Sequence, residues 1–154
     1  MGVGKTTAGR CLAERLDVPF LDLDQVVERA SGRTVPDIFQ TDGEIAFRQQ
    51  ETSALREVLA GEPVVLALGG GTLHHANNRM EICSTADLVC LDMPFAEIQE
   101  RIVASDGGRP LWSQGELLFQ NRLAGYRQSQ HCINVSGLTV NQVVDSIERV
   151  LSCA

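Results

Sequence analysis

The sequence lacks the features that mark several protein classes. In its 154 residues no apolar run approaches the roughly 20 residues that span a bilayer, and the N-terminus lacks the basic-then-apolar layout of a secretory signal. Lysine and arginine number 13 against 20 acidic residues, and a formal net charge of −7 argues against non-specific nucleic-acid binding, which needs a basic surface. The five cysteines are scattered without a C-x-x-C pair. We therefore expect neither a disulfide framework nor a zinc site, and we predict a reducing, cytoplasmic location.

The residues that are present indicate a globular protein, with 44% hydrophobic and 21% charged residues. A chain of this length is predicted to form a single domain with its own core. Apolar runs typical of buried strands alternate with amphipathic helical segments. Such alternation predicts βαβ units, and hence an α/β fold in three α/β/α layers with a central parallel sheet.

The predicted elements follow from periodicity, caps and breakers. Strands are predicted at 19–24, 63–68, 87–93 and 131–135. Helices are predicted from 5–7 to 16, at 26–32, at 34–61 with a turn at Asp42-Gly43, and at 94–102, 116–128 and 139–151. The polar, glycine-rich stretch 103–115 is predicted to be a mobile loop.

The chain begins with a possible phosphate-binding loop. Gly4-Lys5-Thr6 matches the last fixed positions of G-x-x-x-x-G-K-[ST] at the start of a helix. In such a loop, backbone N–H groups converge on a phosphate, the lysine reaches the β- and γ-phosphates, and the threonine hydroxyl binds Mg²⁺. An exposed turn before a helix explains the same residues equally well.

Two further motifs stand at the ends of predicted strands. Asp22-Leu23-Asp24 would place two carboxylates on one side of a strand end, where they could hold a metal through water and accept a proton from a hydroxyl. A solvated helix cap is the alternative interpretation. Gly69-Gly70-Gly71 follows a buried strand directly, and three glycines suit a place where a ligand approaches the backbone closely. An unusual turn is the alternative interpretation.

Three arginines are candidates for binding anions. Arg48 stands three residues before Glu51, so a helical ion pair is also possible. Arg109 falls in the predicted mobile loop and Arg127 near the end of a late helix. A guanidinium group recognises carboxylate through two hydrogen bonds and neutralises phosphate, although each arginine could equally be a solvated surface residue.

Taken in order, these motifs resemble those of the shikimate kinase family. They are GVGKTT, FLDLD, GRTVPDIFQTDGEIAFRQQE, LALGGGT, RPL and RLAGYR, and they cover essentially the whole chain. The resemblance implies a P-loop kinase fold of the nucleoside-monophosphate kinase type. It implies transfer of the γ-phosphoryl group of ATP to the 3-hydroxyl of shikimate, with Mg²⁺ as cofactor, in aromatic amino-acid biosynthesis. It further implies a monomer that binds small molecules and has no nucleic-acid or membrane partner.

The resemblance also implies a role for each motif residue. The catalytic residues would be Lys5, Asp24 and Arg109, the last of them carried by a lid over about residues 104–115 that closes over the reacting groups. ATP would be bound by Gly2, Val3, Gly4, Lys5, Thr6, Thr7 and Arg109. Mg²⁺ would be held by Thr6 and, through water, by Asp22. Shikimate would be bound by Asp24, Arg48, Gly70, Gly71 and Arg127.

The family pattern includes a strand before the phosphate loop, and this chain does not contain it. The first glycine of the loop motif would likewise fall before Met1. Loss of a central strand could cost as much as the roughly 5–15 kcal/mol that stabilises a whole domain. We therefore expect a kinase domain over residues 1–154 that is truncated at its N-terminus, as in a longer gene read from an internal methionine.

Two other functions are compatible with these motifs. A gluconate kinase would share Lys5 and Thr6, but it would not need Arg48, Arg127 and the glycines around a carboxylated ring. A catalytically silent relative that binds shikimate would explain the incomplete phosphate loop. Turnover on gluconate, or binding of shikimate without turnover, would distinguish them.

Overall fold

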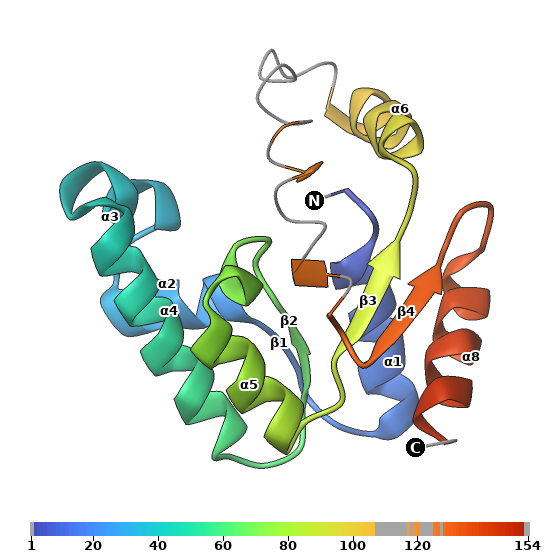
Figure 1. Cartoon of the computed structure of the whole chain (residues 1–154), viewed down its shortest axis with the longest axis horizontal. Coiled ribbons are helices and arrows are strands. Elements are labelled where there is room, and N and C mark those ends of the chain that lie inside the picture. The colour runs from blue at the N-terminus through green and yellow to red at the C-terminus, as the bar shows by residue number, and fades with distance from the viewer. Residues whose placement is uncertain (1, 107–116, 118, 121–124, 127, 153–154) are drawn as a thin grey trace. The chain divides into compact units, whose positions relative to one another are not determined.

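The computed structural model describes residues 2–106, 117, 119–120, 125–126 and 128–152 (Figure 1). The chain forms two compact units: the first comprises Met1–Cys11 and Asp87–Ala154, and the second comprises Leu12–Ala86. Each unit contains one two-stranded parallel sheet. The predicted α/β class with parallel strand pairing is confirmed. Among the described residues, no helix is long and apolar enough to cross a membrane.

In the second unit, β1 and β2 pair in parallel, with Leu21 opposite Leu66. The helix that follows β1 ends at Gly32, which has the left-handed backbone conformation (φ 67°) common after a helix. The elements of this unit are β1 (Phe20–Asp22), α2 (Leu23–Ser31), α3 (Val35–Thr41), α4 (Gly43–Leu59), β2 (Val65–Ala67), the short 3₁₀ helix η1 (Thr72–His74) and α5 (Ala76–Thr85).

Helix α4 is the central helix of the second unit (Figure 1). It packs against α2, α3, α5 and η1. Its apolar face places Phe47 and Leu55 in the core, where they join Ile38 from α3 and Leu23 and Val27 from α2. These contacts hold the backbone of α4 in place within the second unit.

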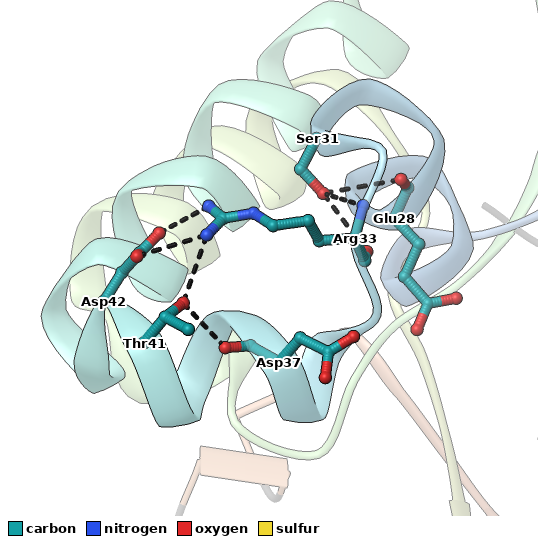
Figure 2. Close-up of polar contacts among 6 residues, drawn as sticks. All are labelled: Glu28, Ser31, Arg33, Asp37, Thr41 and Asp42. Carbon is teal, nitrogen blue, oxygen red and sulfur yellow. Dashed lines mark hydrogen bonds and ion pairs between the residues drawn. The ribbon is translucent and has the colours of Figure 1, made fainter.

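A polar cluster joins the ends of three helices in the same unit (Figure 2). The Arg33 side chain extends from the loop after α2 to the junction of α3 and α4, where its guanidinium pairs with Asp42 and donates to Thr41 Oγ1 at 3.1 Å. The Thr41 hydroxyl in turn donates to the Asp37 carbonyl at 2.8 Å. These contacts link the loop after α2 to the turn predicted at Asp42-Gly43.

In the first unit, β3 (Val89–Asp92) pairs in parallel with β4 (His131–Asn134). Helix α8 (Val140–Leu151) packs on β4 and begins with a capping box, in which Thr139 and Gln142 satisfy each other's backbone N–H groups. The helix predicted at 139–151 is confirmed, with Thr139 as its N-cap. Helix α6 (Phe95–Asp106) follows Pro94, and the unit also holds the first part of α1 (Lys5–Leu16).

Apart from the start of α2, which belongs to the site described below, two helical segments differ from the sequence prediction. No helix was predicted between the three glycines and β3, yet η1 and α5 lie there, because the short, largely polar α5 has little apolar periodicity. Residues 103–106 were predicted to begin a loop but belong to α6, since no helix breaker precedes Gly107. The rest of that loop and most of the predicted helix at 116–128 lie outside the described residues.

Candidate active site

The two carboxylates of the Asp22-Leu23-Asp24 motif lie at the junction of β1 and α2. Asp22 ends the strand, and its Oδ1 accepts a hydrogen bond from the backbone N–H of Asp24 at 3.1 Å. Asp22 is thus the N-cap of α2, which turns the chain into a helix at Leu23. The prediction that both aspartates occupy alternate positions of a strand is wrong, since Asp24 belongs to the first turn of the helix.

Asp24 is a half-buried carboxylate in a negatively charged environment. Burial is the main cause that raises its pKa above the ordinary value, and the charges of Asp22, Glu51 and Glu28 raise it further, while Arg48 opposes them. A carboxylate with a raised pKa binds a proton more readily. This property suits a group that takes the proton of a hydroxyl during a reaction.

Arg48 presents a guanidinium group held from several sides. Its Nη1 donates to Glu51 Oε2 at 2.9 Å, and its Nη2 donates to Glu44 Oε1 at 3.2 Å. Its guanidinium carbon lies 5.1 Å from the centre of the Phe47 ring. The helical ion pair with Glu51 predicted from the sequence is confirmed, and the Arg48 side chain is 16% exposed. An ordered, partly exposed guanidinium is suited to bind a carboxylate.

Two buried residues of this cluster were not predicted as site residues: Thr72, and Glu51, which was considered only as an ion-pair partner of Arg48. Glu51 and Thr72 are both 0% exposed, and the Thr72 hydroxyl donates to Glu51 Oε1 at 2.7 Å. The spacing of Arg48 and Glu51 by three residues was a usable signal, because it places both on one helix face. Nothing in the sequence distinguished Thr72 from any residue that follows a glycine turn.

The three glycines bring the chain close to these side chains. A Cβ added at Gly69 would lie 2.9 Å from Asp24 Oδ1 and 3.3 Å from Glu51 Oε1. A Cβ added at Gly71 would lie 2.3 Å from Arg48 Nη2. The expected close approach to this backbone is therefore made by the protein's own carboxylate and guanidinium groups, and Gly70 lies between the two contact points. Asp24, Arg48 and the glycine turn are brought together within the second unit.

The predicted phosphate loop lies in the first unit. Gly2 and Gly4 have positive φ angles of 70° and 95°, and α1 begins at Lys5, with the Gly4 carbonyl accepting from the Ala8 N–H at 2.9 Å. Lys5 is half-buried, and Thr6 is exposed in the first helical turn. First-turn N–H groups have no partner within a helix, so this loop has the donors that an anion needs.

Lys5 also lies close enough to β3 to affect a thiol there. Burial is the main cause that raises the pKa of Cys90 to about 12, followed by the neighbouring Cys132 and by Asp92, and the positive charge of Lys5 opposes the rise. Cys90 is therefore a protonated thiol at neutral pH and is not a candidate nucleophile. The effect on Cys90 shows that the positive charge of Lys5 lies in the vicinity of β3 within the first unit.

Several predicted site residues cannot be placed. Arg109, Arg127 and lid residues 107–115 lie outside the described residues. Within the described part of the chain, no group of three or more His, Cys, Asp or Glu side chains forms a metal cage. Thr6, in the first unit, carries a hydroxyl oxygen, and Asp22, in the second unit, carries carboxylate oxygens. Oxygen donors of both kinds are ones that Mg²⁺ prefers.

Comparison with known proteins identifies the family. The family model described as "SKI: Shikimate kinase" matches residues 1–152. The chain belongs to the shikimate kinase family. The shikimate kinase of Nitrosomonas europaea is 36% identical over 143 residues, which are 89% of this chain and 67% of that protein.

Solved structures agree with this membership of the shikimate kinase family. The shikimate kinase from Acinetobacter baumannii in complex with shikimate has a TM-score of 0.88 and 34% identity, covering 99% of this chain and 89% of that one. A gluconokinase from Sinorhizobium meliloti 1021 has a TM-score of 0.61 at 18% identity, covering 97% of this chain and 88% of that one. The likeness to the gluconokinase shows only that the two proteins share a fold. It carries no information about the substrate of this chain. The P-loop kinase fold expected from the resemblance is confirmed.

Proposed function

We infer that this chain is a shikimate kinase that transfers the γ-phosphoryl group of ATP to the 3-hydroxyl of shikimate. One observation carries the inference: within the second unit, a proton-accepting carboxylate and a guanidinium stand over the same glycine turn, with Asp24 at Gly69 and Arg48 at Gly71. An acceptor with both a hydroxyl and a carboxylate needs these two groups together. Membership of the shikimate kinase family supports shikimate as that acceptor.

On the acceptor side, each group has a distinct task. Arg48 binds the shikimate carboxylate with its planar fork of donors, and Arg127 adds a second cation. The backbone at Gly70 and Gly71 lines the ring. Asp24 orients the 3-hydroxyl and takes its proton as the oxygen attacks the γ-phosphorus, while the bond from that phosphorus to the bridging oxygen breaks and ADP leaves.

On the nucleotide side, charge neutralisation is the main task. The N–H groups from Gly2 to Thr7 surround the phosphates, and Lys5 neutralises the charge that develops on the β- and γ-phosphates. Arg109 adds a second cation from the lid. The Thr6 hydroxyl and the Asp22 carboxylate would hold Mg²⁺, which would supply Lewis-acid stabilisation of the phosphate oxygens.

The proposal includes a monomeric protein in the cytoplasm. The five cysteines are scattered along the sequence without a C-x-x-C pair, a pattern that supports a reducing compartment. Light scattering coupled to gel filtration measures the mass directly, and a stable dimer would contradict this part of the proposal.

The test measures ADP formation from Mg-ATP by the full chain with shikimate, with gluconate and with no acceptor. Turnover that depends on shikimate supports the proposal, whereas turnover on gluconate alone overturns it. Binding of shikimate without turnover identifies a silent relative. The variant Arg48→Lys keeps the charge but loses the fork, so its KM for shikimate should rise about tenfold. Arg56→Lys is the matched control, since Arg56 is an exposed arginine of the same helix that pairs with Glu81.

A further inference from the structure

Glu51 is completely buried, and its two carboxylate oxygens have different partners. Oε2 accepts from Arg48 Nη1 at 2.9 Å, and Oε1 accepts from the Thr72 hydroxyl at 2.7 Å. Burying a carboxylate is costly unless it is both paired with a cation and hydrogen-bonded. Both conditions are met here. In this orientation of the Glu51 side chain, each carboxylate oxygen has a donor.

Thr72 links this carboxylate to the glycine turn. A threonine hydroxyl has one proton to donate, and this one goes to Glu51. Thr72 directly follows Gly71, and a Cβ added to that glycine would lie within 2.7 Å of the guanidinium carbon and both terminal nitrogens of Arg48. The contacts therefore return to their starting point: Arg48 binds Glu51, Glu51 binds Thr72, and the neighbouring Gly71 lies against Arg48. The guanidinium is held between the Glu51 carboxylate and the Gly71 backbone.

Asn78 ties the same turn to α4 at a second point. It is 1% exposed, its side-chain nitrogen donates to the Thr72 carbonyl at 3.4 Å, and its side-chain oxygen accepts from the Thr52 hydroxyl at 3.1 Å. Thr52 is the residue after Glu51 in α4. Thr72 is thus connected to α4 through its hydroxyl and through its carbonyl, and both connections end on neighbouring residues of the helix.

We propose that Thr72 is a positioning residue for the acceptor-binding Arg48, which it controls through Glu51, and that Asn78 secures Thr72 for this task. The inference rests on the proposed function, because it concerns how the shikimate carboxylate is bound. Without the hydroxyl, Glu51 Oε1 would be buried without a donor, and such a carboxylate turns toward another partner. Arg48 would move with it, which weakens binding of shikimate and leaves binding of ATP unchanged.

The test compares variants of the full chain that keep or remove the hydroxyl. Thr72→Val has nearly the same shape and no hydroxyl, and its KM for shikimate is expected to rise about tenfold with an unchanged KM for ATP. Thr72→Ser restores the hydroxyl and should bring the KM for shikimate back to within about twofold of wild type. Thr85→Val is the matched control, because Thr85 is exposed at the end of α5 and its hydroxyl bonds only backbone carbonyls.

A spectroscopic measurement reports on the arginine itself. The Arg48 Nε–H resonance, assigned by its loss in Arg48→Lys, should shift in Thr72→Val and stay in place in Thr72→Ser and Thr85→Val. An unmoved resonance, or equal KM values for shikimate in the Val and Ser variants, overturns the proposal. If wild type shows no shikimate-dependent turnover, the proposed function fails and the resonance still decides the role of Thr72.

A second variant covers the case in which Thr72→Val does not fold. Thr52→Val removes the donor to Asn78 at a half-buried position on α4. Because this acts one step further from Arg48, the KM for shikimate should rise about two- to threefold, with the KM for ATP unchanged. A KM for shikimate equal to that of wild type, or a parallel rise in both KM values, would contradict a positioning network.

Discussion

The two units build their candidate binding sites in different ways. In the second unit, side chains hold one another: Arg48 binds Glu51, and Glu51 binds Thr72. In the first unit, the loop before α1 depends on backbone conformation, with positive φ at Gly2 and Gly4. The difference predicts different sensitivities. A side-chain site is disturbed by lost hydrogen bonds or by crowding, whereas a backbone site is disturbed by any residue that cannot adopt its φ angle.

Asp24→Asn should have the largest effect on turnover, because it removes the reacting group from the site built of side chains. We expect kcat to fall by about 10²- to 10⁴-fold, the range for loss of a general base, with the variant still folded. The measurement is shikimate-dependent ADP formation at saturating substrates. A kcat within a few-fold of wild type would show that Asp24 does not take the proton.

The same variant should be more stable than wild type. The pKa of Asp24 is raised by burial and by neighbouring carboxylates, so between the unfolded and folded pKa values the folded state keeps a proton that the unfolded chain has lost. Stability therefore falls as pH rises through that interval. Thermal unfolding should show a gain for Asp24→Asn that is present at neutral pH and disappears at acidic pH, below the ordinary range of an aspartate.

Gly71→Ala introduces crowding into the same site with little backbone strain. Gly71 has φ −101°, which alanine adopts freely, but the new Cβ would lie 2.3 Å from Arg48 Nη2. The end of the arginine side chain can move, so thermal stability should change little. A displaced guanidinium should raise the KM for shikimate about 10- to 100-fold. Gly61→Ala is the control, since its Cβ meets nothing closer than 3.4 Å.

Gly4→Ala, in the first unit, introduces backbone strain without crowding. A Cβ at Gly4 would have no atom within 4 Å, but its φ of 95° is strained for alanine, at a cost of roughly 1–3 kcal/mol. We expect the KM for ATP to rise about tenfold as the loop relaxes, with the KM for shikimate unchanged. Gly137→Ala has the same open space at φ 70°. Gly137→Ala should therefore lower the melting temperature and leave the KM for ATP unchanged. Equal KM values for ATP in Gly4→Ala and Gly137→Ala would show that the loop does not bind nucleotide.

The sequence predicted the backbone-built site more completely than the side-chain-built site. Glycine, lysine and threonine at a helix start are local signals, and the structure has the loop and helix where they were predicted. The hydrogen bond between Thr72 and Glu51 joins residues 21 positions apart, and no local pattern reports such a contact. Asp24 shows a different kind of error: strand alternation and a helix cap both suit Asp-x-Asp, so the pattern left both open, and the structure has the cap, with Asp22 before the first turn of α2.

Asp42→Asn should have the smallest effect, because the Arg33–Asp42 pair lies at the surface, with side chains 40% and 33% exposed. The hydrogen bond from Arg33, and then that from Thr41, lowers the pKa of Asp42. Its folded pKa is thus below the unfolded value, so the pair stabilises above the unfolded pKa and loses its effect as pH falls through the folded pKa. Asp42→Asn should lower the melting temperature slightly at neutral pH, and the difference from wild type should close in acid. A double-mutant cycle with Arg33→Gln isolates the contribution of the pair to the free energy of unfolding. The KM for shikimate should not change. A rise would show that this cluster, at the start of the helix that carries Arg48, belongs to the network of the acceptor site.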